Sequence, residues 1–221
     1  MVIWLILAIC AAAIETFAVQ KQIKRLQFPA KPAVMIFLFI WLYTNTGLQG
    51  NALWFGLGIL SSLVGDVVLL GKSDRMFLIG LNAFLLTHIL YLLGFQEQLR
   101  NITAWSFVLL VLIFINGTRI LTRIVGSMRA RGQNALVIPT IVYSLTISLM
   151  LYAGMSTIFD PTWTTSASFF VSVGAFLFFM SDIVLAWNKF VSPMKNGHIL
   201  NLITYHLGQI CLIAGIISQL G

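Results

Sequence analysis

The sequence predicts an all-α membrane protein whose eight transmembrane helices form two four-helix repeats. Hydrophobic residues make up 59% of the 221-residue chain and charged residues only 9%, whereas soluble domains carry about 25% charged residues. The apolar stretches approach the roughly 20 residues that a helix needs to cross a bilayer, and they lack the alternation of transmembrane β-strands. In addition, one short acidic motif occurs twice, at matching places in the two halves.

Each predicted helix is justified by one apolar segment of suitable length. In order along the chain these segments are 2–19, 32–49, 51–70, 76–96, 102–121, 134–157, 165–187 and 198–219. We expect Pro32 to start the second helix, where its missing N–H costs little, and Pro139 to kink the sixth. The links are short, so we expect a single integral membrane domain over residues 1–221.

The basic residues are divided unevenly between the two sides of the predicted membrane. Of the 13 Lys and Arg residues, only Arg100 falls at the link between the fourth and fifth helices. The others lie at the links that follow the first, third, fifth and seventh helices. The positive-inside rule therefore predicts these four links in the cytoplasm and both termini outside it. We expect a multi-pass protein of a bacterial inner membrane, and the loop positions of the cations give no reason to expect a nucleic-acid partner.

Two aspartates inside apolar helices are the strongest indication of a site. Asp66 and Asp182 each follow a small residue, and each is followed by an apolar residue and then by Val and Leu. Each lies on the third helix of a half, so we expect internal repeats at about 1–100 and 101–221, related by an axis along the membrane normal. A carboxyl in a bilayer is costly and persists mostly where it faces a polar cavity. We therefore expect Asp66 and Asp182 to face one shared cavity.

Other polar side chains fall at similar depths in the predicted helices. A rise of about 1.5 Å per residue places both aspartates roughly 7–8 Å from the predicted cytoplasmic side. Candidate positioning residues in the same layer or slightly deeper are Glu15, Asn82, His88, Tyr91, Tyr143 and Tyr205. Glu15 could instead pair with a loop cation, His88 could serve only as an interhelical hydrogen-bonding group, and the tyrosines could serve only in packing.

A pair of buried carboxyls can supply acid–base chemistry without a metal. In a low-dielectric site one carboxyl tends to stay protonated while the other is ionised. Such a pair suits hydrolysis through an oxocarbenium ion, and it equally suits a proton-coupled transporter of small molecules or lipids. A non-catalytic membrane partner or sensor is a third alternative. No nucleophile or nucleotide-binding motif is present, and the histidines lack metal-ligand spacing, so we expect no cofactor and no metal.

Taken together, the motifs resemble the YhhN family of eight-span membrane proteins, which includes the lysoplasmalogenases. The resemblance rests on Lys31-Pro32, Gly65-Asp66, Phe77, Gly80, Phe84, His88, Tyr91, Ser181-Asp182, Asn188-Lys189-Phe190, Tyr205 and Gln209. It implies hydrolysis of the vinyl ether bond of a lysophospholipid in the bilayer, with Asp66 and Asp182 as acid and base. It also adds Lys31, Asn188 and Gln209 to the positioning residues. Lys31, Lys72 or Arg75 would then meet the phosphate of the lipid.

Overall fold

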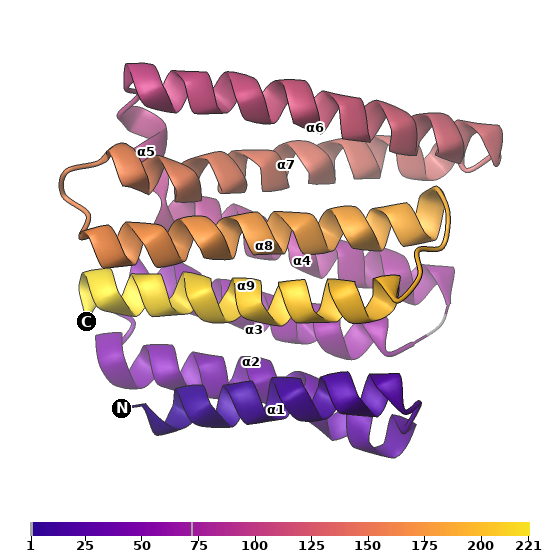
Figure 1. The fold of residues 1–221 in the computed structure, drawn as a ribbon, viewed down its shortest axis with the longest axis horizontal. Coiled ribbons are helices and arrows are strands. Elements are labelled where there is room, and N and C mark those ends of the chain that lie inside the picture. Colours follow the sequence, from indigo (N-terminus) through magenta and orange to yellow (C-terminus); the bar gives the residue numbers. More distant parts are fainter. Residues whose placement is uncertain (1, 72) are drawn as a thin grey trace.

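A computed structural model describes residues 2–71 and 73–221, which form a bundle of roughly parallel and antiparallel helices (Figure 1). Eight helices in the described part of the chain are long and apolar enough to cross a membrane, which confirms the predicted fold class. The α-helices are α1 (Ile3–Gln20), α2 (Lys24–Thr46), α3 (Ala52–Leu69), α4 (Asp74–Gly94), the short α5 (Gln96–Arg100), α6 (Ala104–Ala130), α7 (Val137–Ser156), α8 (Thr165–Phe190) and α9 (Gly197–Leu220).

Three predictions about helix ends are wrong. α2 begins at Lys24, so Pro32 lies inside the helix rather than at its start, as membrane helices allow when neighbouring groups satisfy the freed backbone. Pro139 is the third residue of α7, in the first turn, where an N–H has no intrahelical partner to lose. α6 continues to Ala130, because the arginines that end its apolar pattern are good helix formers.

Side-chain caps fix the starts of several long helices. Ser73, Thr103 and Thr164 each accept a hydrogen bond from the backbone N–H three residues further on, at the first turns of α4, α6 and α8. Such caps satisfy N–H groups that a helix leaves unpaired at its N-terminus. At its other end α2 stops at Gly47, which has a φ of 61° that favours glycine. At these four helix ends, a capping side chain or a glycine between the apolar segments fixes where the helix starts or stops.

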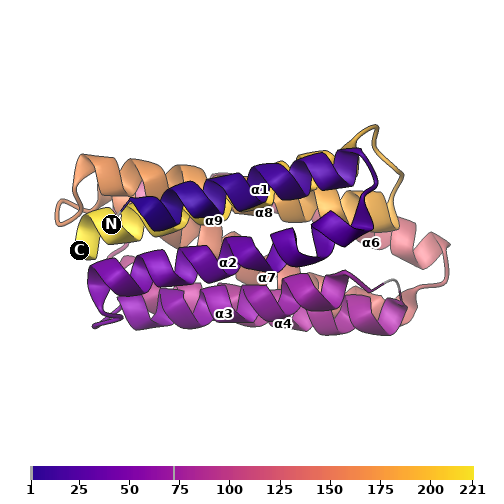
Figure 2. The ribbon, with the colours of Figure 1, turned by 90° about the horizontal axis from the view of Figure 1, so that it is seen from below.

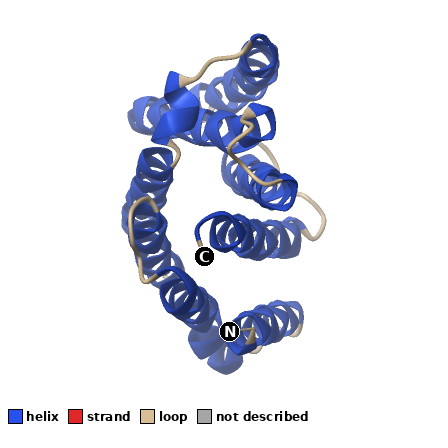
Figure 3. Ribbon diagram, turned by 90° about the vertical axis from the view of Figure 1, so that its left-hand side faces the viewer, coloured by secondary structure: helices blue, strands red, loops and turns tan. Residues whose placement is uncertain are grey.

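The links that follow α1, α3, α6 and α8 gather at one end of the bundle, on the right in Figure 1, and both termini lie at the other end. We call the first end the basic end, because its links and the adjoining helix turns carry the basic residues noted above. Its cytoplasmic location stays a prediction. α2 packs between α1 and α3 (Figure 2), and the end-on view shows the other helices curving around α9 (Figure 3).

The contacts between helices follow a similar pattern in the two halves. α3 packs on α4 as α8 packs on α9, and α4 contacts α7 as α9 contacts α2. In each half, therefore, the third helix carries an aspartate and the fourth helix reaches across to the second helix of the other half. This is the pattern that two four-helix repeats would give, and the repeat itself stays a prediction.

Glycines allow α8 and α9 to lie unusually close together. A Cβ added to Gly174 would lie 2.4 Å from the backbone N of Leu212, and one added to Gly208 would lie 2.8 Å from the backbone N of Phe178. Because lipid supplies little driving force for helix association, small residues that let backbones approach are a main source of stability. This interface holds the second aspartate helix firmly against the last helix.

Candidate active site

Side chains from α4 and α7 meet at the carboxyl of Asp182 in α8. Tyr143 in α7 donates a hydrogen bond to its Oδ2 atom. The Nε2 atom of His88 in α4 lies 3.1 Å from the same oxygen and 3.1 Å from the Tyr143 hydroxyl. We call these three residues the Asp182 cluster. The Asp182 side chain is 11% exposed, so it is held by protein groups while one side stays accessible.

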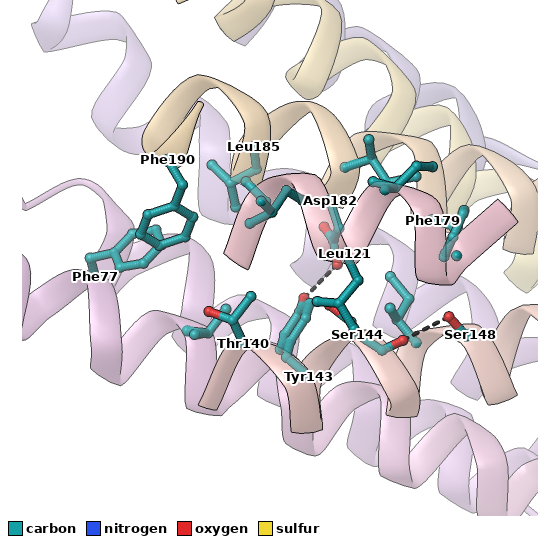
Figure 4. A pocket seen from close by; sticks show the side chains of 17 residues that line it. Phe77, Leu121, Thr140, Tyr143, Ser144, Ser148, Phe179, Asp182, Leu185 and Phe190 are labelled. Carbon is teal, nitrogen blue, oxygen red and sulfur yellow. Dashed lines mark hydrogen bonds between the residues drawn. The ribbon is translucent and has the colours of Figure 1, made fainter. Parts of the chain in front are cut away.

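The accessible side of Asp182 opens into a cavity between α4, α6, α7 and α8 (Figure 4). The space in and around the cavity, counting the part that is open to the outside, is about 660 Å³, of which about 60 Å³ can hold the centre of a water-sized molecule. Figure 4 shows Phe77 and Phe190 at one end, Phe179 and Ser148 at the other, and Asp182 between them. The wall is mostly apolar, and its lining residues include Leu81, Gly117, Ile120, Leu121, Ile124, Thr140, Tyr143, Ser144, Ile147, Ile183, Leu185 and Ala186.

Asp66 lies in a separate and more enclosed cluster. Lys31 Nζ is 3.5 Å from its Oδ1 atom, and the Tyr205 hydroxyl donates a 2.9 Å hydrogen bond to Oδ2. We call these three residues the Asp66 cluster. The Asp66 side chain is only 2% exposed, and Asp66 is not among the residues that line the cavity at Asp182. Among the described residues, therefore, the two aspartates do not share the cavity at Asp182.

An aromatic layer formed by Phe84 and Phe178 connects the two clusters. The Phe178 ring centroid lies 5.4 Å from that of Tyr205 and 4.7 Å from that of His88. Phe84 lies 5.6 Å from Tyr205 and close to Gly65, where an added Cβ would be 2.8 Å from its ring. Apolar rings thus pack against both clusters. The small residue before Asp66 is what allows Phe84 to approach so closely.

Two predicted residues, Tyr91 and Gln209, bind each other rather than an aspartate. The Tyr91 hydroxyl donates a 2.6 Å hydrogen bond to Gln209 Oε1, and Gln209 Nε2 donates a 2.9 Å hydrogen bond to Ser62 Oγ. Ser62 lies 3.1 Å from the Thr87 hydroxyl. This buried chain joins α3, α4 and α9. Ser62 and Thr87 were not predicted, because isolated hydroxyls in apolar helices give no distinctive signal.

Glu15 is buried and paired with His206, a residue that was not predicted to belong to the site. His206 Nε2 lies 2.7 Å from Glu15 Oε2, so α1 and α9 are joined by a pair that excludes water. An available signal was that both residues are costly to leave unpaired inside a bilayer. Each residue requires a polar partner, and in this structure Glu15 and His206 are partners of each other.

Two predicted positioning residues lie away from both aspartates. Asn82 is exposed on α4; it is six residues from His88, which at about 100° per residue turns it some 120° away from the buried face. Asn188 accepts a 2.8 Å hydrogen bond from the Met194 backbone N–H and so shapes the link between α8 and α9. Within the described part of the chain, no three His, Cys, Asp or Glu side chains gather closely enough to hold a metal ion.

Comparisons with known proteins identify a family and several relatives. The model of the YhhN family matches residues 26–216. The Mus musculus protein named lysoplasmalogenase TMEM86B is 27% identical over 203 residues, which cover 86% of this chain and 74% of the relative. The Homo sapiens protein of the same name is 27% identical, covering 82% and 70%. A lysoplasmalogenase homolog of Dictyostelium discoideum is 26% identical, covering 73% and 62%. No solved structure matches the chain.

Proposed function

The chain belongs to the YhhN family, and we propose that it is a membrane hydrolase that cleaves the vinyl ether bond of lysoplasmalogen-type lysophospholipids. The products are a fatty aldehyde and a glycerophospho head group. Relatives named lysoplasmalogenase support a hydrolase of ether lipids. The observation that carries the proposal is the position of Asp182 on the wall of a mostly apolar cavity that is open to the outside.

The chemistry requires a proton donor beside the double bond. Protonated Asp182 gives its proton to the β-carbon of the vinyl ether, and the α-carbon and ether oxygen then share the charge of an oxocarbenium ion. The carboxylate left behind faces this cation and stabilises it. Water adds its oxygen to the α-carbon and returns one proton to the protein, and the resulting hemiacetal separates into the aldehyde and the alcohol of the head group.

Tyr143 and His88 hold Asp182 in the position that this reaction requires. Both contact one carboxylate oxygen, Oδ2, while Ser181 Oγ lies 3.2 Å from the other. Interactions that fix a catalytic group before the substrate arrives reduce the reorganisation that the reaction must pay for. We assign Tyr143 and His88 to positioning, and His88 is also close enough to exchange a proton with Asp182.

We propose that Asp66 is the second catalytic carboxyl and activates the attacking water. Its position on the matching helix of the other half supports this role. Because Phe178 contacts both clusters, the role requires the aromatic layer to move when substrate binds. A mechanism with Asp182 and His88 alone needs no such movement. The two mechanisms predict different rates for the Asp66→Asn variant.

The test is aldehyde release by purified protein. The protein in detergent micelles is incubated with a lysoplasmalogen and, as a control, with the 1-acyl lysophospholipid of the same chain length. Aldehyde from the vinyl ether substrate only is the expected result. The same preparation in proteoliposomes is assayed for proton-coupled lipid flux. Flux without aldehyde would contradict the hydrolase proposal and favour a proton-coupled transporter.

A further inference from the structure

The predicted head-group contacts do not explain how the cavity at Asp182 would recognise a lysolipid. Lys31 lies on α2 and contacts buried Asp66, Arg75 is exposed at the start of α4, and Lys72 lies outside the described residues. Neither Lys31 nor Arg75 lines the cavity. Recognition of a lipid at Asp182 therefore depends on the groups that form the cavity wall.

The polar side chains of the cavity wall differ in whether they already have a partner. The Tyr143 hydroxyl donates to Asp182, and the Ser148 hydroxyl donates a 2.7 Å hydrogen bond to the Ser144 carbonyl oxygen. The hydroxyls of Thr140 and Ser144 also belong to the wall, and neither makes a hydrogen bond to any residue in the described part of the chain. These two hydroxyls are therefore free to bind a molecule in the cavity.

Thr140 differs from other threonines in the long helices of this protein. Thr16, Thr118 and Thr146 each donate a hydrogen bond to the backbone carbonyl four residues earlier, which is a common way for a helix to satisfy a threonine. Thr140 makes no such bond, although it is only 6% exposed. A buried hydroxyl without a partner is costly and so requires an explanation. A polar group of a bound molecule would provide the missing partner.

Thr140 lies between Asp182 and the basic end of the bundle. It is the fourth residue of α7, which begins at that end, and Figure 4 shows it on the side of Asp182 where Phe77 and Phe190 lie. Ser148 lies eight residues further along α7, about 12 Å deeper. A single-chain lipid keeps its head group at the membrane surface and its chain in the hydrocarbon. The head group of a lipid bound at Asp182 therefore lies on the Thr140 side, and its chain lies on the Ser148 side.

The step from Tyr143 to Thr140 matches the distance from the vinyl ether to the nearest hydroxyl of the lipid. Three residues of α7 rise about 4.5 Å along the helix axis. In a lysoplasmalogen, four bonds lead from the α-carbon of the vinyl ether to the sn-2 hydroxyl oxygen, and at about 1.2 Å per bond of an extended chain they span roughly 5 Å. Because Tyr143 contacts Asp182, a vinyl ether at Asp182 brings this hydroxyl to the level of Thr140.

On these grounds we propose that the Thr140 hydroxyl hydrogen-bonds the free sn-2 hydroxyl of the lysolipid and so helps to select lipids with a single chain. The proposal rests on the proposed function, and it names the substrate group that the cavity wall recognises. A two-chain lipid has an ester oxygen in place of this hydroxyl, and an ester oxygen cannot donate a hydrogen bond. Its second chain would also begin where the Thr140 side chain lies.

The experiment compares two vinyl ether substrates that differ only in this hydroxyl, a lysoplasmalogen and its analogue with hydrogen at the sn-2 position. Thr140→Val keeps the shape of the side chain and removes its hydroxyl. It is expected to lower kcat/KM for the lysoplasmalogen by about fivefold, the effect of one hydrogen bond between neutral groups, and to leave kcat/KM for the analogue unchanged. Thr140→Ser should keep the preference for the lysoplasmalogen. The unfolding temperature of Thr140→Val should not fall, because no hydrogen bond within the protein is lost.

Two variants of the same helix are the controls. Thr146→Val removes a hydroxyl that donates to the Val142 carbonyl oxygen and does not line the cavity, so it should leave the preference between the substrates intact. Ser144→Ala removes the other unpaired hydroxyl of the wall, one turn deeper than Thr140, and should also leave the preference intact. Loss of the preference in Ser144→Ala instead of Thr140→Val would overturn the proposal. Equal losses on both substrates in Thr140→Val would overturn it as well.

A binding measurement separates this proposal from the proposed function. The ligands are a 1-alkyl lysophospholipid, which has no vinyl ether to cleave, and its analogue with hydrogen at the sn-2 position. The hydroxyl-bearing ligand should bind about fivefold more tightly, and Thr140→Val should abolish the difference. Absence of aldehyde from the lysoplasmalogen together with this Thr140-dependent difference would reject the proposed function and leave the hydroxyl site standing. Equal Kd values for the two ligands in the unchanged protein would overturn the hydroxyl site.

Discussion

Replacing Asp182 by Asn should nearly abolish hydrolysis while leaving the protein folded. The amide has almost the shape of the carboxyl, and its oxygen can still accept the hydrogen bond that Tyr143 donates to Asp182. What the amide lacks is a proton to give to the vinyl ether and a negative charge to face the oxocarbenium ion. Loss of general acid–base help alone costs about 10²–10⁴ in rate, which corresponds to roughly 3–5 kcal/mol of transition-state stabilisation.

The assay is the initial rate of aldehyde release from a lysoplasmalogen in micelles across pH 5–8, with thermal unfolding of each variant as a control for folding. We expect kcat to fall by at least a hundredfold and the unfolding temperature to stay close to that of the unchanged protein. His88→Ala and Tyr143→Phe should lower the rate less, because both residues position Asp182 and neither is assigned as the proton donor to the substrate. An Asp182→Asn variant that keeps a third or more of the normal rate would refute the assignment of Asp182 as the proton donor.

Three further perturbations test other parts of the account. Asp66→Asn should lower the rate of aldehyde release by about 10²–10⁴-fold. The variant that carries both Asp66→Asn and Asp182→Asn should be little slower than either single variant, because the residues act as a unit. A near-normal rate for Asp66→Asn would favour Asp182 acting with His88. Gly117→Leu should raise KM by about tenfold for a long-chain lysoplasmalogen and much less for a short-chain one, because Gly117 lines the cavity and an added Cβ there meets only the Ser148 hydroxyl at 3.6 Å; equal effects on both chains would place the lipid tail elsewhere. Ser192→Cys, with Cys10 and Cys211 replaced, should react with an impermeant thiol reagent only after cells are permeabilised, and labelling in intact cells would reverse the predicted orientation.

The sequence was enough to predict the fold class because its evidence is local. Each span can be recognised from the length and hydropathy of its own segment, and the bilayer requires that such a span be a helix. The errors fell at helix ends, because a helix can continue through residues of good helix propensity after its apolar segment has ended. α6 runs past its apolar segment, and α2 begins before Pro29 and Pro32.

The sequence pointed to candidate residues for the site but not to their arrangement, and the chemistry assigned to them stays a prediction. The cost of a carboxyl in a membrane pointed to both aspartates, yet their partners come from helices distant in sequence. The sequence carries no signal that Tyr205 would bind Asp66 while Tyr143 binds Asp182. Asn82 was misplaced because its depth was considered without its direction around the helix. The aromatic layer between the clusters also went unpredicted, since a phenylalanine at such a position is indistinguishable from ordinary packing.

The most direct test of the central claim is the isotopic composition of the aldehyde formed in D₂O. The claim is that the protein protonates the β-carbon of the vinyl ether before water adds. The aldehyde is reduced as it forms, to prevent later exchange, and the resulting alcohol is analysed by mass spectrometry. The account predicts one deuterium on the carbon next to the former carbonyl, in a product that depends on Asp182. Deuterium uptake at that carbon that proceeds at an undiminished rate in the Asp182→Asn variant would show that Asp182 does not deliver this proton, and would contradict the account.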